Sequence, residues 1–364
     1  MRRTVKNKGG FLPRVHFLAH DLCFAVHDIL TQFLVSGEAG GIFEGRIEFS
    51  GKDEAASFEA TDDIFDWLEN SGRFEDRAVI LKTLVLPAVL SDLLHCLYEA
   101  LESSRKAKLN VTYILVRKPL QESLYLLESI VLDELDFATQ LATDPLRLRP
   151  KVAGGPDGHA GRIERVLKII SQTEAFDAAY LAQLRYEKVE DGFDGICNKA
   201  IHLFTDHKAI RTELLNINFV FSGLDAKVSQ WQYFYSRMPY LLVYPWRVVE
   251  HVGTSICATH PDYSADVSRR VSAFVVLCEK TATHMTPQLQ RFYDAQRAWL
   301  RKHCEEAGYR VPRQKDLERM ALNGALPGED EMSVQARHAM FETRAARNRA
   351  MARADDEEYA PRTN

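Results

Sequence analysis

The segment that most restricts the fold is residues 108–141, where an apolar helical repeat continues through a proline. Its apolar side chains are spaced 3, 4, 4, 3, 4 and 4 residues apart, as on one face of an α-helix: Tyr113, Val116, Leu120, Leu124, Leu127, Val131 and Leu135. Pro119 lies inside this stripe, and a proline within a helix removes one backbone hydrogen bond and bends the helix. We therefore expect a long buried helix that is kinked at Pro119 and does not end there.

Two charged residues flank the expected kink. Lys118 and Glu122 are four residues apart and share a helix face with Leu115, whose carbonyl loses its usual donor because of the proline. A helical pair in this order contributes only about 0.2–0.5 kcal/mol, whereas a carboxylate among apolar side chains needs a partner. Two interpretations stay open: a charged pair that lines an inner cleft, or a structural ion pair between helices.

The composition favours a large soluble protein. The chain has 364 residues, of which 46% are apolar, so it can bury a core without disulfides. Its six cysteines are scattered with no CxxC pair, which predicts a reducing, cytoplasmic setting. No uninterrupted apolar run reaches the roughly 18 residues of a membrane span, so no membrane partner is expected. A net charge of -5 argues against a wholesale nucleic-acid-binding surface but permits a local basic patch.

Helical periodicity recurs along nearly the whole chain, which predicts an all-α helical bundle with long kinked helices and little or no β-structure. Besides the kinked segment, the expected helices span residues 11–35, 61–70, 75–104, 161–171, 175–187, 193–206, 224–258 and 266–307. Only residues 42–49 hint at a short strand pair. The proline- and glycine-rich residues 143–161 predict a long loop, a candidate boundary within a single helical domain of residues 1–310. The mixed-charge residues 311–364 predict a mobile tail with a helix at 333–354.

The first expected helix carries the sharpest metal-like pattern. His16, His20, Cys23 and His27 lie opposite its apolar stripe, and all are potential zinc ligands. His16 and His27 are eleven residues apart, about 16 Å at 1.5 Å per residue, so one ion reaches at most two adjacent members. We therefore assign no metal and no other cofactor. The alternatives are a polar contact between helices or between two copies of the chain, and plain exposure.

Aromatic residues concentrate in the expected helix 224–258: Trp231, Tyr233, Phe234, Tyr235, Tyr240, Tyr244 and Trp246. Aromatic side chains bury large apolar areas, so most of them are expected in the core. The alternative is an exposed patch that, with the polar face of the first helix, forms an interface for a dimer or another partner.

A second polar constellation follows one helix face. Asp194, Asn198, His202 and Thr205 are spaced 4, 4 and 3 residues apart, and Arg211 lies just beyond them. Histidine is the side chain most easily poised for proton transfer near neutral pH, and an Asn or Asp one turn away can fix its tautomer. The pattern is a candidate for acid–base chemistry, and the alternative is an ordinary solvated helix face.

The segment that follows, residues 212–222, mixes apolar residues that are expected to be buried with Asn216 and Asn218. Buried amides need hydrogen-bond partners. A structural role is therefore expected for this segment rather than a catalytic one.

The kinked helix with Lys118, Pro119 and Glu122, followed by a helix with Asn198 and His202, resembles uncharacterised bacterial helical families related to the HEPN superfamily. The resemblance covers roughly residues 100–251. It implies a helical bundle, often a homodimer, and in many members a metal-independent RNase activity in toxin–antitoxin and phage-defence systems.

The chain departs from that superfamily in two respects. The catalytic mark of the superfamily is an Arg followed by a His after four to six residues, and it occurs here only at Arg14 with His20 and Arg297 with His303, as often as chance predicts. Lys118 also stands where an arginine is expected, and lysine lacks bidentate phosphate recognition.

We therefore expect a cytoplasmic bacterial protein that acts on or binds RNA or nucleotides in stress or phage defence. In an enzyme of this kind, five residues carry the chemistry: His202 as general base or acid, Asn198 orienting it, Lys118 and Arg211 stabilising phosphate charge, and Glu122 positioning Lys118. Two alternatives stay open: a non-catalytic interaction or dimerisation protein, and a metal-dependent hydrolase that uses histidines of the first helix.

Overall fold

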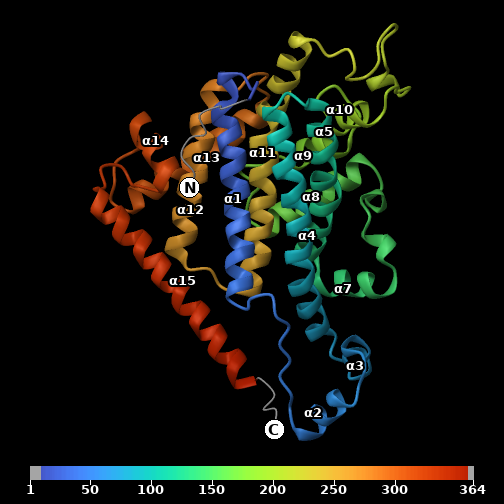
Figure 1. Ribbon diagram of the computed structural model, residues 1–364, viewed down its shortest axis with the longest axis vertical. Coiled ribbons are helices and arrows are strands. Elements are labelled where there is room, and N and C mark those ends of the chain that lie inside the picture. Colours follow the sequence, from blue (N-terminus) through green and yellow to red (C-terminus); the bar gives the residue numbers. More distant parts are fainter. Residues whose placement is uncertain (1–9, 360–364) are drawn as a thin grey trace.

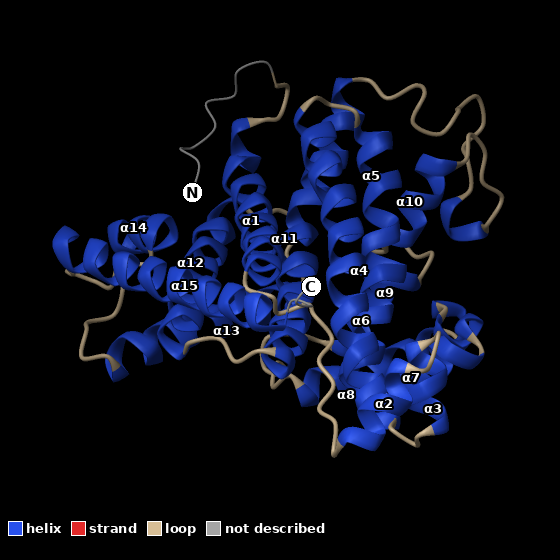
Figure 2. Ribbon diagram, turned by 60° about the horizontal axis from the view of Figure 1, so that its bottom comes forward, coloured by secondary structure: helices blue, strands red, loops and turns tan. Residues whose placement is uncertain are grey.

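The computed structural model describes residues 10–359, and the described chain consists of helices joined by turns and loops, with no strand (Figures 1 and 2). The all-α prediction is therefore confirmed. The strand pair suggested for residues 42–49 is wrong, because these residues form turns and an irregular segment. No further strand is present among the described residues to pair with them, and an isolated strand pair is at best marginally stable.

The α-helices are named in chain order. They are α1 (Phe17–Ala39), α2 (Lys52–Glu59), α3 (Ile64–Asn70), α4 (Phe74–Arg105), α5 (Leu109–Lys118), α6 (Leu124–Leu132), α7 (Glu134–Thr143), α8 (Pro156–Ile169), α9 (Ala178–Tyr186), α10 (Phe193–Ile201), α11 (Leu224–Ile256), α12 (Pro261–Cys278), α13 (Pro287–Glu306), α14 (Gln314–Asn323) and α15 (Glu331–Tyr359). A π-helix, η2 (Pro119–Ser123), joins α5 to α6. Short 3-10 helices lie in the connections: η1 (Arg14–His16), η3 (Pro145–Leu148), η4 (Pro150–Ala153), η5 (Lys208–Ile210) and η6 (Glu279–Thr281).

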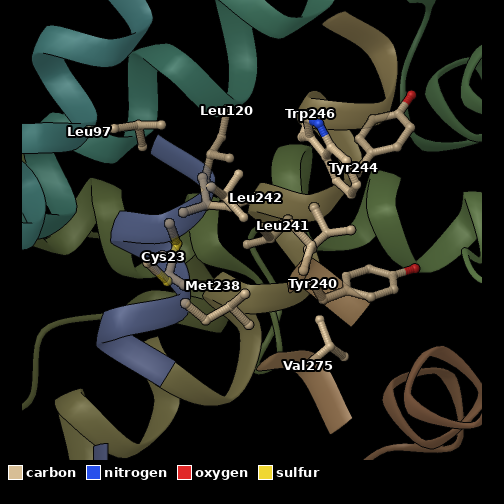
Figure 3. Packing of buried hydrophobic residues seen from close by; sticks show 14 of the residues in the cluster. Cys23, Leu97, Leu120, Met238, Tyr240, Leu241, Leu242, Tyr244, Trp246 and Val275 are labelled. Carbon is tan, nitrogen blue, oxygen red and sulfur yellow. The ribbon is translucent and has the colours of Figure 1, made fainter. Parts of the chain in front are cut away.

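The long helices α1, α4 and α11 form the centre of the bundle (Figure 1). Helices α12 and α13 pack on one side of them, and α5, α6, α8, α9 and α10 pack on the other. Side chains from α1, α4, η2, α11 and α12 meet in one continuous apolar core, part of which is seen in Figure 3: Cys23, Leu97, Leu120, Met238, Leu241, Leu242 and Val275. The aromatic residues of α11 lie in this core, with Tyr233 half-buried. The core prediction for this segment is confirmed, and α11 offers no exposed aromatic patch.

The kinked helix is present as expected up to residue 132. Helix α5 passes through Pro119 into η2 and then α6 without ending, and the stripe from Tyr113 to Leu127 is buried. The extension to Leu141 is wrong. Asp133 has an extended backbone and its carboxylate accepts a hydrogen bond from the Asp136 amide at 2.9 Å, so it caps a new helix, α7. Leu135 therefore leaves the stripe and is exposed.

Prolines explain two further differences from the predicted helices. Pro156 and Pro287 are the first residues of α8 and α13, positions where a proline loses no intrahelical hydrogen bond. The predicted helix 266–307 is therefore two helices, and the Thr286 side chain accepts a hydrogen bond from the Leu289 amide at the start of the second. The predicted long loop of residues 143–161 is shorter for the same reason and contains η3 and η4.

The expected tail is helical, and its first part packs on α12. Val334 and Met320 are buried, and Asp266 of α12 forms an ion pair with Arg337 of α15 at 3.2 Å. Arg269 also donates a hydrogen bond to the Gly324 carbonyl at 3.0 Å. The helix predicted at 333–354 is thus present as part of α15. Mobility of the tail stays a prediction, and residues 360–364 lie outside the described chain.

The first-helix histidines are buried, because α1 contacts neighbours on both of its faces. His20 Nδ1 is 2.8 Å from the Tyr235 hydroxyl, and the ring of His16 stacks on Tyr235 with centroids 5.5 Å apart. Of the alternatives for this face, the structure shows the contact between helices. Among the side chains that the structure describes, no group of three or more His, Cys, Asp or Glu residues is arranged to hold a metal ion.

Two helical segments, Arg14–Ala39 and Phe74–Arg105, are long and apolar enough by length and composition to cross a membrane. Both are central helices of the bundle, and core helices commonly have such a composition.

Replacing His16 with Phe is expected to weaken the pH dependence of stability between pH 6.5 and 4, leaving the share of His20 and His159, whose pKa values burial also lowers to about 4. Burial lowers the pKa of His16 from 6.5 to about 4, so in this range the unfolded chain binds a proton that the folded chain does not. The free energy of unfolding therefore falls as the pH falls, by up to about 1.4 kcal/mol per pH unit for one such histidine. Phe keeps the ring contact with Tyr235 and removes the buried Nε2, which has no partner within the described chain.

Urea unfolding at pH 7 and pH 4.5 measures this effect. Other titrating groups, such as Asp21, whose pKa burial raises to about 6, are present in both proteins and cancel in the comparison. The exposed His207 provides the control, His207→Phe, which should keep the wild-type loss. Equal losses in the wild type and His16→Phe would contradict a neutral buried His16.

Candidate functional site

The structure brings the two polar constellations of the sequence together, because α10 packs against α5. The contact is made by Arg117 and Asp194 rather than by Lys118 and His202. The buried Asp194 carboxylate accepts hydrogen bonds from Arg117 Nε at 3.2 Å, Gln121 Nε2 at 2.7 Å and Asn198 Nδ2 at 3.1 Å, all through Oδ1. We call these four residues the kink junction.

Lys118 and Glu122 lie on the outside of the kink. Lys118 is exposed and forms an ion pair with Asp92 of α4 at 2.7 Å. Glu122 is exposed and has no ion pair among the described residues. The expected inner cleft lined by Lys118 and Glu122 is therefore wrong, and the interhelix ion pair exists with Asp92 in place of Glu122. The physical reason is the helix face: Arg117 and Gln121 continue the buried side of Tyr113, whereas Lys118 and Glu122 point away from it.

The expected pairing of Asn198 with His202 is also wrong. Helix α10 ends at Ile201, not at residue 206, and His202 has an extended backbone with φ -110° and ψ 130°. The Asn198 amide instead donates to the carbonyl and the carboxylate of Asp194. His202 and Arg211 are exposed on the loop that follows α10. Neither of the two cavities described in the structure is lined by any of the five predicted catalytic residues.

A buried ion network lies directly inside the kink junction and was not predicted. Glu128 of α6 and Arg185 of α9 have side chains with no exposed surface, and Arg185 Nη1 donates to Glu128 Oε1 at 2.5 Å. The Tyr244 hydroxyl donates to the same oxygen at 2.8 Å. Burial alone would lower the pKa of Arg185, but Glu128 raises it above its ordinary value, so the guanidinium stays charged. One sequence signal pointed here: Glu128 interrupts an apolar run at a position next to the buried Leu127.

The π-helix explains why the network is located at the kink. A π-helical turn disturbs the regular backbone pairing of an α-helix, and its carbonyls become available to other donors. Arg185 Nε donates to the Leu120 carbonyl at 2.6 Å, and the Tyr186 hydroxyl donates to the Gln121 carbonyl at 3.1 Å. From the sequence, the Leu115 carbonyl was the one expected to accept a hydrogen bond from outside the helix. In the structure, the Leu120 and Gln121 carbonyls accept such bonds.

Gln121 connects the network to the kink junction. Its side-chain amide donates to both the Arg185 carbonyl, at 2.5 Å, and Asp194. Arg162 of α8 adds a longer ion pair to Glu128, with Nε 3.9 Å from Oε2; it also covers the ring of Tyr125 at 3.9 Å and donates to Ser129 Oγ at 2.6 Å. Because Glu128 and Arg185 are matched with each other and closed off from solvent, this arrangement can hold α9 and α10 in place.

His159 lies at the edge of the same network. Its ring stacks on Tyr186 with centroids 3.7 Å apart and an interplanar angle of 11°. Burial, and after it the charge of Arg185, lower the pKa of His159 to about 4, so the ring is neutral at pH 7. A neutral stacked ring packs against Tyr186 without adding a third positive charge beside Arg185 and Arg162.

The loop between α10 and α11, residues 202–223, exposes many apolar side chains, and we call it the apolar loop. It projects beyond α5 and α10 at the upper right of Figure 1. Leu214 and Leu215 are fully exposed, at 97% and 102%, and four other large apolar residues of the loop are more than half exposed: Leu203, Phe204, Val220 and Phe221. The expectation that the apolar residues of 212–222 are buried is wrong for most of them.

The backbone of the apolar loop is nevertheless fixed by internal hydrogen bonds. The Thr205 and Thr212 backbones and hydroxyls bond to each other, with the Thr212 amide 2.9 Å from the Thr205 carbonyl. The side-chain amide of the buried Asn218 donates a hydrogen bond to the His202 carbonyl at 2.9 Å. Asn218 therefore has the hydrogen-bond partner that a buried amide was expected to need. Leu215 and Phe219 have positive φ angles of 61° and 59°, which bulky residues rarely adopt. Such conformations persist only where the surrounding structure imposes them.

Comparison with known proteins supplies no relative: no family model, curated protein or solved structure matches this chain.

Glu128→Ala is expected to destabilise the fold far more than Lys118→Ala, although both remove one half of an ion pair at the same kink. The first leaves the Arg185 guanidinium buried and unpaired, which costs about 3–5 kcal/mol. The second breaks an exposed pair, which contributes less than about 1 kcal/mol. Urea unfolding at pH 7 gives both values, and a loss below about 1 kcal/mol for Glu128→Ala would show that the network is not a main constraint on the fold.

Proposed function

We propose that the protein is a non-catalytic interaction protein that binds a partner protein through the apolar loop. The observation that carries this proposal is the full exposure of Leu214 and Leu215 on a loop whose backbone is fixed. Burying a leucine side chain contributes about 1.5–3 kcal/mol, so two leucines and their neighbours offer enough free energy for a specific contact. Contiguous exposed apolar patches of this kind mark interaction sites in soluble proteins.

The fixed backbone supports the same proposal. A flexible loop loses conformational entropy when it binds, whereas a pre-ordered loop avoids most of that cost. In the apolar loop, Ile210 is buried next to α10 and Phe219 packs against Tyr113, with ring centroids 5.9 Å apart. The inward-facing residues therefore hold the loop while Leu214, Leu215 and Phe221 face outward. The buried ion network and the kink junction support this loop by fixing α10, which leads into it.

The variant Leu214→Ser/Leu215→Asn is expected to lose the partner while keeping the fold. Ser removes one apolar anchor, and Asn removes the other at a positive φ angle that Asn tolerates. Loss of two anchors predicts at least about a tenfold weaker complex. Wild type and variant are immobilised and incubated with extract of the source cells, the retained proteins are quantified by mass spectrometry, and the affinity of each purified partner is measured.

Leu146→Ser is the matched control, because Leu146 is an exposed leucine in η3, away from the apolar loop. A partner retained by the wild type and the control but not by the loop variant supports the proposal. Identical protein sets on all three would contradict it, provided that the urea midpoints of the three proteins agree.

A second proposal, RNA binding in bacterial stress or phage defence, is favoured by the charges next to the loop. Lys199, His202, Lys208 and Arg211 make no ion pair within the described residues, and the exposed rings of Phe204 and Phe221 lie in the same segment. Basic side chains with exposed aromatic rings are the usual means of binding single-stranded nucleic acid. This proposal keeps the likeness to the HEPN-related families and the proposed roles of His202 and Arg211 near phosphate.

Lys208→Gln/Arg211→Gln is expected to weaken binding to a single-stranded RNA oligonucleotide and to reduce the salt dependence of that binding. Each lost phosphate contact lowers the slope of log K against log salt by about 0.7, so the pair should lower it by about 1.4. Fluorescence anisotropy in 50–200 mM salt gives the slope. Arg147→Gln/Lys151→Gln, two exposed basic residues without ion pairs in the described chain, is the control.

The same preparation tests the enzymatic version of the RNA proposal. RNA integrity is followed after expression of the wild type and of His202→Ala. RNA that is fragmented by the wild type and intact with His202→Ala would establish a nuclease and contradict the non-catalytic proposal. RNA that stays intact with both proteins is the expected result.

A further inference from the structure

A second exposed apolar surface is a groove of about 550 Å³ at the other end of α11 from the apolar loop. The ends of α1 and α11, the start of α12 and the middle of α15 form its walls. Its lining includes four aromatic rings and several aliphatic side chains, among them Ile29, Phe33, Trp246, Tyr263 and Phe341. A cleft of this size and character encloses a compact apolar ligand.

The groove and the apolar loop of one molecule cannot meet. Helix α11 begins directly after the loop and ends at the groove, and its 33 residues span about 50 Å at 1.5 Å per residue. Figures 1 and 2 both show the loop beyond α5 and α10, away from the ends of α1 and α11. Any contact between the two surfaces therefore joins two copies of the chain.

The charges beside the two surfaces are complementary. Arg211 and Glu213 precede Leu214 in the loop, and Glu342 and Arg344 line the rim of the groove on α15. Within the described residues none of these four side chains has an ion pair. Each surface therefore offers one free positive and one free negative group, two residues apart, beside an apolar contact region. Opposite charges arranged in this way fix the register of an interface.

We propose that Leu214 and Leu215 of one copy occupy the groove of the next copy. This inference rests on the proposed function, because it identifies the partner of the apolar loop as a second copy of the chain. The interface is heterologous: each copy contributes its loop to one neighbour and its groove to another. Such contacts produce a ring where the rotation closes and an open chain where it does not, so assembly continues beyond the dimer. It differs from a symmetric dimer in which two loops pack on each other.

The test uses one variant with a disabled loop and one with a disabled groove. Leu214→Ser/Leu215→Asn keeps the groove intact. Gln32→Trp keeps the loop intact and places a bulky ring at the groove from an exposed position on α1. Ala345→Glu is an independent groove variant, and the control Leu146→Ser leaves both surfaces unchanged. Sedimentation velocity of the full chain over a hundredfold concentration range gives the masses, and urea midpoints verify that each variant folds.

We expect the wild type and the control to form species larger than a dimer as concentration rises, and each variant alone to remain monomeric. A mixture of the loop variant with either groove variant should form a one-to-one dimer and nothing larger, because one intact loop and one intact groove remain. Groove variants that associate as the wild type does, or a mixture that stays monomeric, would overturn the inference.

The failure of this inference can be distinguished from the failure of the proposed function. A wild type that stays monomeric, while the loop variant still loses a partner from cell extract, overturns only the self-association. A wild type that stays monomeric and a loop variant that retains every partner overturn both.

Discussion

The ion pair between Glu128 and Arg185 is the contact on which the arrangement of the helices around the kink depends. Both side chains are fully buried, and the groups in this network come from four separate parts of the chain: η2 and α6, α8, α9, and α11. A buried ion pair adds little net stability compared with apolar residues, but removal of one partner is costly. Its effect is therefore to exclude other packings, since any shift of α9 along α6 would separate the two charges in a medium of low polarity.

The proline explains why such a pair is found at this position. Pro119 begins a π-helical turn in place of the regular helix, and the Leu120 and Gln121 carbonyls within that turn accept hydrogen bonds from Arg185 and Tyr186. These two hydrogen bonds join the kinked segment to α9. The Gln121 side chain also donates a hydrogen bond to Asp194, which lies on α10, so the position of α10 is tied to the kink. The kink between α5 and α6 thus helps to set the position of α10 and of the apolar loop that follows it.

Other elements of the fold are joined in a similar manner. Arg237 of α11 forms an ion pair with Asp191 before α10, with Nε 2.8 Å from Oδ1, and Asp266 of α12 accepts hydrogen bonds from Arg269 and Arg337. Charged side chains thus connect helices that are distant in the sequence, while the apolar core supplies most of the burial. The functional proposals concern the apolar loop and the groove lined by α15, because both present apolar side chains to solvent.

The sequence by itself determined the helical class, the passage of the helix through Pro119, the buried aromatic residues of α11 and the need of Asn218 for a partner, because these depend on periodicity and on the cost of burying unpaired polar groups. Helix ends were less predictable, as at Asp133 and Pro287. A cap or a proline can start a new helix within one or two residues although the apolar repeat continues through that point. Only the tertiary structure decided which polar residues meet. Lys118 and Arg117 are neighbours in the sequence, but a rotation of about 100° per residue sends one to solvent and the other to Asp194, and spacing alone does not show which face a distant helix will cover.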